Sequence, residues 1–244
     1  MNNYKFTIQY DGTDFAGWQM QRNADTIQDE LTRCLKILTR EDITLIGAGR
    51  TDAGVHALGQ TANFRTQMEI EVPKFQYSLN SMLPFSIAVL SMEKVDEKFH
   101  SRFDAKSRSY YYIFNSVKSP FYKKYSYFYP RSEKLDANEL NELSKYLIGN
   151  KDYSSFAKTG SETETNFCDV TFARWNRKNS FLIFYIEANR FLRGMVRAIV
   201  GTMLERVEDR SNEFSIEKIF EQKNRDAAGR SVPAQGLILY KVRY

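Results

Sequence analysis

Residues 43–64 read ITLIGAGRTDAGVHALGQTANF, where two runs rich in apolar residues flank a stretch with three glycines within eight residues. Apolar and β-branched runs bounded by glycine are typical of strands. Glycine permits tight turns and lets another backbone or a ligand approach closely. The sequence therefore predicts a loop between two strands, with the side chains of Arg50 and Asp52 directed outward at a cleft.

The residues on either side of this loop predict further strands and helices. YKFTIQY, residues 4–10, alternates apolar and polar side chains, as a half-buried strand does. Thr26, with Asp29 three residues later, is in position to cap a helix. Pro73 fits the first turn of a second helix. Apolar residues recur at helical spacing after the cap: Ile27, Leu31, Cys34, Leu35 and Leu38.

The second half of the chain repeats this pattern. Residues 107–115 predict a strand, and Asp136 begins a helix that we expect to end at Gly149. The other elements expected are, in order, a hairpin over residues 167–188, helices over about 191–207 and 215–222, and a strand over 237–244.

Strands outnumber helices and often adjoin through short turns. The fold class expected is therefore α+β, with a largely antiparallel sheet flanked by helices. A boundary near residue 105 divides the chain into two βαβ-containing halves, residues 1–104 and 105–244. Because no low-complexity linker marks this boundary, we expect the halves to share one continuous sheet around a central basic cleft.

Composition favours a polyanionic partner without proving one. Lys and Arg number 35 against 30 acidic residues, for a net charge of +5. Cations neutralise phosphates and release condensed counterions, so a basic protein suits a nucleic acid.

The two cysteines lie far apart, and with only two histidines a His/Cys zinc site lacks close ligands. The first residues lack an apolar signal core, so we expect a cytoplasmic protein.

The glycine-rich loop carries the residues suited to catalysis. The Asp52 carboxylate is ionised at neutral pH, since the reference pKa of Asp is about 3.9, and can act as a nucleophile. A neighbouring arginine such as Arg50 favours the ionised form and aims it. On spacing alone, a surface loop in which Asp52 caps a turn and pairs with Arg50 is the commoner arrangement.

Longer motifs decide between these interpretations. GRTDAGVHA, residues 49–57, resembles the active-site motif of the tRNA pseudouridine synthase A family. The resemblance continues along the chain in YDGTDFAGWQMQ (10–21), KSRSYYYIF (106–114), DYSSFAK (152–158), FLRGMVRAIVGTM (191–203) and VPAQGLIL (232–239). Two residues of these motifs depart from the family's pattern: Tyr153, where Phe is common, and Val232, where Ala is common.

The resemblance implies a pseudouridine-synthase-like fold and an isomerase that converts uridine to pseudouridine in the anticodon stem-loop of tRNA, at positions 38, 39 and 40. It implies no cofactor and no metal, and a homodimer that binds tRNA. Asp52 matches the family's nucleophile, Tyr110 the tyrosine of its R-x-Y block, and Arg197 the arginine of its F-L-x-x-M-V-R block. The target base must leave its stack to reach Asp52, and Tyr110 is the candidate platform for it.

The helix expected over residues 191–207 gives an argument of its own. Arg190, Arg193, Gly194, Arg197 and Gly201 gather on the side opposite its apolar arc. Because glycine inside a helix costs roughly 1 kcal/mol relative to alanine, two glycines on one face suggest that something packs closely there. We hypothesise that Arg197 pairs with Asp52. The candidate RNA-binding residues are Arg50, His56, Gln60, Arg108, Lys158, Arg190 and Arg193, besides Tyr110.

Two other functions are open to such a chain. A non-catalytic tRNA-binding or RNA-chaperone module on the same fold would keep the basic residues but tolerate loss of the aspartate. A metal-dependent nuclease would need clustered carboxylates, whereas GRTDAG offers one acid. The joint presence of Asp52, Tyr110 and Arg197 favours the isomerase.

Overall fold

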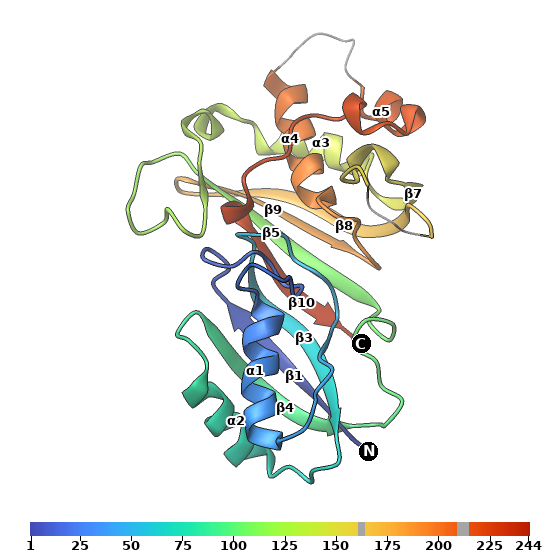
Figure 1. Cartoon of the computed structure of the whole chain (residues 1–244). Helices are drawn as coiled ribbons and strands as arrows, with labels where there is room; N and C mark the ends of the chain where they lie inside the picture. The colour runs from blue at the N-terminus through green and yellow to red at the C-terminus, as the bar shows by residue number, and fades with distance from the viewer. Residues whose placement is uncertain (161–163, 209–214) are drawn as a thin grey trace. The chain divides into compact units, whose positions relative to one another are not determined.

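The computed structural model describes residues 1–160, 164–208 and 215–244, and its described strands and five helices form an α+β fold with mostly antiparallel pairing (Figure 1). The chain divides into two compact units. Unit 1 comprises Met1–Lys106 with Leu239–Tyr244, and unit 2 comprises Ser107–Ile238. Along the described chain, no helix combines the length and apolarity needed to cross a membrane.

In unit 1 the sheet has the strand order β4-β1-β3-β10. Its strands are β1 (Asn2–Tyr10), β3 (His56–Thr66), β4 (Ile87–Val95) and β10 (Leu237–Arg243), which starts in unit 2. β1 runs antiparallel to both β3 and β4. The rings of Tyr4 and Phe64 stack with centroids 5.9 Å apart, so the alternation seen in residues 4–10 builds the core.

Two helices cover this sheet, and Figure 1 shows α1 lying across it. In α1 (Ile27–Thr39) the hydroxyl of Thr26 accepts the N–H of Asp29 at 3.2 Å, which confirms the predicted cap. α2 (Val72–Met82) contains Pro73 in its first turn, as predicted. The Cys34 thiol is buried on the apolar face of α1, and burial raises its pKa.

Unit 2 holds a second antiparallel set of strands in the order β5-β9-β8-β7. These are β5 (Ser107–Asn115), β7 (Gly149–Asp152), β8 (Phe167–Lys178) and β9 (Phe181–Ala188), with the short β6 (Tyr127–Phe128) parallel to β5. Helices α3 (Ala137–Lys145), α4 (Met195–Glu208) and α5 (Ile216–Gln222) lie on one side of them in Figure 1. The core is aromatic: Trp175 lies 4.7 Å from Phe184 between ring centroids.

Several boundaries differ from those expected. α3 begins after its cap Asp136 but ends at Lys145, and Gly149 starts β7 instead of stopping the helix. The helix expected from residue 191 begins only at Met195, because Gly194 has φ +71°, outside the helical region. The strand expected before the glycine-rich loop is the two-residue β2 (Ile46–Gly47), which includes the first glycine.

The last residues belong with unit 1, although the expected division assigned them to the second half. The physical reason is a set of hydrogen bonds with residues 101–106. The N–H of Lys106 donates to the carbonyl of Arg243 at 2.8 Å, and the Tyr244 hydroxyl donates to the carbonyl of Ser101 at 2.8 Å. The proposed domain boundary near residue 105 stays a prediction.

Candidate active site

The predicted loop between two strands occupies residues 48–55, between β2 and β3. It leaves the sheet at Ala48, whose N–H donates to the carbonyl of Thr61 at 2.8 Å. A tight turn follows, in which the N–H of Val55 donates to the carbonyl of Asp52 at 3.2 Å and Gly54 adopts φ +74°. Asp52 is half-buried and Arg50 is exposed, so the turn presents both side chains at the surface of unit 1.

A second segment, residues 10–18, holds the loop on both sides of Asp52. The N–H of Trp18 donates to the carbonyl of Thr51 at 3.0 Å, and the N–H of Gly54 donates to the carbonyl of Phe15 at 3.3 Å. The hydroxyls of Tyr10 and Thr51 share a buried hydrogen bond of 2.8 Å. The backbone that carries Asp52 is therefore fixed by a segment more than 30 residues away in sequence.

Two glycines allow this close approach. Gly17 has φ +100°, and a Cβ built there would lie 2.6 Å from the carbonyl oxygen of Thr51. A Cβ on Gly12 would lie 2.1 Å from the carbonyl oxygen of Val55. Any side chain at either position would push the two segments apart. The glycines of YDGTDFAGW are thus required by the loop that they contact.

His56 lies beneath the loop and contacts the turn at residues 11–12. Its side chain is only 3% exposed. The N–H of Gly12 donates to its Nδ1 at 3.1 Å, and the Asp11 carboxylate lies 3.2 Å from the same nitrogen. The sequence suggests His56 as an RNA contact, whereas its burial favours structural support of the loop. The RNA contact stays a prediction.

Gln60 supports the opposite end of the loop. Its side chain is fully buried, its Nε2 donates to the carbonyl of Gly49 at 2.9 Å, and its Oε1 accepts the N–H of Thr61 at 3.2 Å. Both ends of the amide therefore bind backbone, and the side chain acts on the loop that precedes Asp52. The sequence motif suggested only an RNA contact for Gln60, and that role stays a prediction.

In unit 2, Arg197 lies near the start of α4 and is half-buried. Its Nε donates to the carbonyl of Val232 at 2.7 Å, and the N–H of Val232 donates to the carbonyl of Arg197 at 3.2 Å. The adjacent carbonyl of Pro233 accepts the hydroxyl of Tyr112 at 2.7 Å. The segment around Val232 thus links α4 to strand β5.

The expectation that something packs closely on the glycine face of α4 is confirmed at Gly201. A Cβ there would lie 1.7 Å from the carbonyl oxygen of Arg230, so the chain just before Val232 touches the helix backbone. Gly194 has a different role, since it lies outside α4 with φ +71°. Arg190 and Arg193 therefore precede the helix and do not belong to its face.

Tyr110 lies in the middle of β5, where it pairs with Ile186 of β9. It is 9% exposed, and its ring meets that of Phe191 edge to face, with centroids 5.1 Å apart. Such a T-shaped pair favours one orientation of each ring. The tyrosine predicted as a stacking platform is thus held rigidly in unit 2.

The basic residues predicted as RNA contacts fall into small groups. The N–H of Lys158 donates to the carbonyl of Arg193 at 2.8 Å, and both side chains are exposed. Arg108 donates to the carbonyl of Asn189 at 2.8 Å, and Asn189 directly precedes Arg190 in the chain. Within unit 2 the fold therefore brings Lys158 to Arg193.

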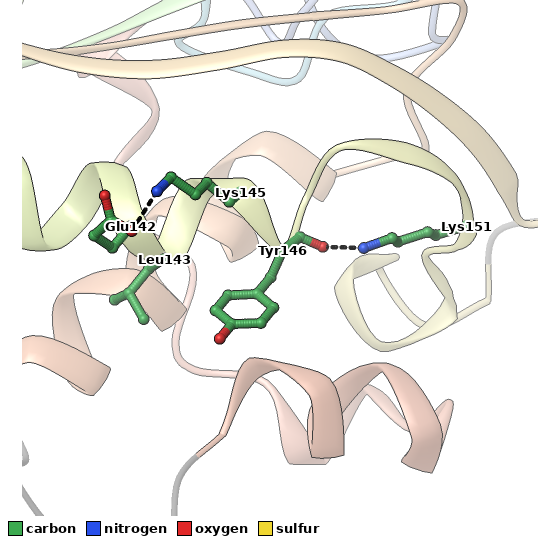
Figure 2. A pocket seen from close by; sticks show the side chains of 5 residues that line it. All are labelled: Glu142, Leu143, Lys145, Tyr146 and Lys151. Atoms are coloured by element: carbon green, nitrogen blue, oxygen red, sulfur yellow. Dashed lines mark hydrogen bonds and ion pairs between the residues drawn. The ribbon is translucent and has the colours of Figure 1, made fainter.

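The hollow that Figure 2 shows in unit 2 does not involve the predicted site residues. It is lined by residues at the end of α3 and the start of β7: Glu142, Leu143, Lys145, Tyr146 and Lys151. Lys145 pairs with Glu142, and Lys151 donates to the carbonyl of Tyr146. Both lysines of this hollow therefore already bind a carboxylate or backbone.

Comparison with known proteins adds an independent observation. The sequence model of a family described as tRNA pseudouridine synthase matches residues 7–104 and 143–244. Asp52 and Arg197 fall inside these ranges, whereas Tyr110 falls between them.

Curated relatives match over nearly the whole chain. The tRNA pseudouridine synthase A of Clostridium acetobutylicum is 42% identical over 245 residues, covering 100% of both chains. Proteins of the same name match from Acetivibrio thermocellus, at 41% with 100% of both chains covered, and from Bacteroides fragilis, at 41% over 99% of this chain and 96% of that one.

Proposed function

Because this chain belongs to the tRNA pseudouridine synthase family, we propose that it isomerises uridine to pseudouridine in the anticodon stem-loop of tRNA, at positions 38, 39 and 40. Asp52 is the nucleophile in this proposal. The observation that carries it is the match of curated family members along the full chain, together with the loop that holds Asp52.

The contacts around the loop support a catalytic use of Asp52. A reacting carboxylate gains most when its position is set before the substrate arrives, since misplacement by about 1 Å can cost a hundredfold in rate. Backbone hydrogen bonds from Trp18 and to Phe15, and the buried amide of Gln60, hold both ends of the loop. The carboxylate is therefore carried by a backbone that needs little rearrangement when the RNA binds.

The reaction rearranges bonds within one nucleotide. The bond between C1′ of the ribose and N1 of the uracil breaks, the base turns, and a new bond forms between C1′ and C5. The proton on C5 leaves and N1 gains one, so the product is an isomer of the substrate. Asp52 can attack C6, attack C1′, or remove a proton from C2′, and each route requires the base to leave its stack.

Residues of unit 2 complete the proposal. Tyr110 stacks on the extruded base, and Arg197 supplies a positive charge to the site. Base–aromatic stacking is worth about 1–3 kcal/mol per base. The hydrogen bond from Arg197 Nε to the carbonyl of Val232 supports a fixed guanidinium, and the edge-to-face contact with Phe191 supports a fixed ring.

RNA binding draws on the cations that reach the surface. Arg50, Arg108, Lys158, Arg190 and Arg193 contact phosphates in this proposal, which positions the RNA without reading its sequence. The enzyme requires neither cofactor nor metal. It acts in the cytoplasm, and it is a homodimer, as the resemblance to the family implies.

The test is release of tritium from tRNA labelled at uridine C5. Forming the C5–C1′ bond expels the label into water, so release reports this isomerisation directly. We expect wild-type protein to release tritium and Asp52→Asn to release none while still binding tRNA. Asp42→Asn is the matched control, because it makes the same change at an exposed carboxylate of unit 1, which pairs with Lys36 at 2.9 Å.

Two results would contradict the proposal. If wild-type protein binds several unmodified tRNAs and releases no tritium, the chain is a binding module. If release survives in Asp52→Asn, Asp52 is not the nucleophile, although the isomerase activity stands.

A further inference from the structure

The chain between β5 and α3 has a composition unlike the rest. Residues 117–131, VKSPFYKKYSYFYPR, contain six aromatic residues, four Lys or Arg, and no acidic residue. Acidic and basic residues are nearly balanced over the whole chain, at 30 and 35, so this run of positive charge is a local feature. The family model leaves residues 105–142 unmatched, so it does not account for this 117–131 segment.

Four of the six aromatic side chains of the 117–131 segment are exposed, whereas Tyr127 and Tyr129 are half-buried against Phe114. Phe121 is 84% exposed, and Tyr122, Tyr125 and Phe128 are each between 43% and 47% exposed. The four cationic residues are exposed as well: Lys118, Lys123, Lys124 and Arg131. Several exposed aromatic residues in one short segment are an unusual feature of a protein surface, and exposed apolar groups of this kind commonly mark an interaction site.

The segment is nevertheless anchored to the fold of unit 2. The carbonyl of Asn115 accepts the N–H of Tyr129 at 2.9 Å, and its side chain accepts the N–H of Val117 at 3.1 Å, so one buried residue ties both ends. The ring of Tyr122 packs edge to face on Phe181, with centroids 5.0 Å apart. Figure 1 shows the segment as a yellow-green excursion that leaves β5. Its exposed aromatic rings therefore lie on a loop that hydrogen bonds fix at both ends.

Charge decides which partner fits. A two-fold contact between copies brings the same surface of each copy together, so two segments with four cations and no acid would repel each other. Unpaired nucleotides offer the complement of both features, since their bases stack on aromatic rings and their phosphates attract lysine and arginine. The segment combines the two kinds of side chain that bind single-stranded RNA.

We propose that the 117–131 segment is a second RNA-contact surface, which stacks on unpaired bases of the tRNA. The inference rests on the proposed function for the identity of the RNA. It adds to that function a surface built from Phe121 and the neighbouring lysines. Its residues bind the substrate and take no part in the chemistry.

The experiment measures the affinity of the full-length protein for unmodified tRNA at several salt concentrations. Phe121→Ala is expected to weaken binding about fivefold or more, as removal of one base stack would. Phe121→Trp, which keeps an aromatic face, is expected to retain wild-type affinity. Lys118→Ala combined with Lys123→Ala is expected to lower the slope of log K against log salt by about 0.7 for each phosphate that is no longer neutralised.

Matched controls separate this surface from general effects. Phe85→Ala removes a fully exposed aromatic ring from unit 1, and Lys145→Ala removes an exposed cation from unit 2. Neither is expected to change tRNA affinity. Circular dichroism and sedimentation of every variant report folding and oligomeric state. Tritium release at saturating tRNA is expected to be unchanged in the Phe121 variants.

Three outcomes would overturn the inference. The first is unchanged tRNA affinity in a folded Phe121→Ala protein, and the second is an equal drop in affinity in Phe85→Ala. The third is a loss of self-association in Phe121→Ala, which would assign the segment to contact between copies. The proposed function fails separately. If affinity depends on Phe121 but wild-type protein releases no tritium, the surface stands and the isomerase does not.

Discussion

The Nε of Arg197 donates to the carbonyl oxygen of Val232 at 2.7 Å, and the N–H of Val232 donates to the carbonyl oxygen of Arg197 at 3.2 Å. This reciprocal pair joins α4 to the segment ahead of β10, within unit 2. A guanidinium has five N–H donors in a rigid fork, so binding through Nε orients the other four. The charge of Arg197 is thereby positioned by backbone.

Arg197→Lys is expected to lower kcat/KM for tRNA about a hundredfold. Lysine lacks the guanidinium fork that binds the carbonyl of Val232 through Nε, so its charge is displaced, and a displacement of about 1 Å can cost about a hundredfold in rate. Tritium release under single-turnover conditions measures the effect. Arg33→Met, at an exposed arginine of α1 that pairs with Glu30, serves as the control and is expected to act as wild type. Wild-type rates in Arg197→Lys and Arg197→Met would remove Arg197 from the site.

Gln60→Leu is expected to lower kcat with little change in KM, because the buried amide supports the Asp52 loop. Leaving the carbonyl of Gly49 without its donor also costs about 1–3 kcal/mol of unfolding free energy. Gln76→Leu is the control. It removes a similar hydrogen bond, which the side-chain amide of Gln76 donates to the carbonyl of Val89 at 3.1 Å, and it is expected to keep kcat. A rise in KM alone for Gln60→Leu would instead indicate an RNA contact.

Gly17→Ala is expected to lower the unfolding free energy by about 1–3 kcal/mol, because its backbone has φ +100° and the new Cβ would meet the carbonyl of Thr51. Urea unfolding measures the change. For comparison, Gly49→Ala adds its Cβ to open space in the loop at 48–55 and is expected to stay within about 0.5 kcal/mol of wild type. Equal stability of the two variants would contradict this account.

Cys168 predicts a sensitivity to alkaline pH. Burial raises the pKa of its thiol from 9.0 to about 11, while the Arg190 guanidinium opposes the shift. Between these values the unfolded chain loses a proton that the folded chain keeps, so folding stability falls as pH rises from about 9 to 11, by about 3 kcal/mol. Urea unfolding at pH 8 and pH 11 is expected to show a smaller decrease in stability for Cys168→Ala than for wild type. Equal decreases would mean that other groups control the alkaline transition.

The sequence determined those parts of the fold that depend on neighbouring residues. Alternation in residues 4–10 predicts strand β1, the pair Thr26 and Asp29 predicts the start of α1, and Pro73 predicts the first turn of α2. Each signal is local, because side-chain direction in a strand, a helix cap and the φ angle of proline depend on a few adjacent residues. The loop at 48–55 and its exposed Arg50 follow from the same kind of signal.

Only the tertiary structure decided what supports that loop in unit 1 and what holds Arg197 in unit 2. The hydrogen bonds of Gly12 with His56, of Gly49 with Gln60, and of Arg197 with Val232 join residues 44, 11 and 35 positions apart. A hydrogen bond between distant residues depends on where the folded backbone brings them, and periodicity along the chain carries no such information. For the same reason the burial of Gln60 and its bond to the carbonyl of Gly49 could not be read from the sequence, whereas the later start of α4, at Met195, follows from the positive φ of Gly194.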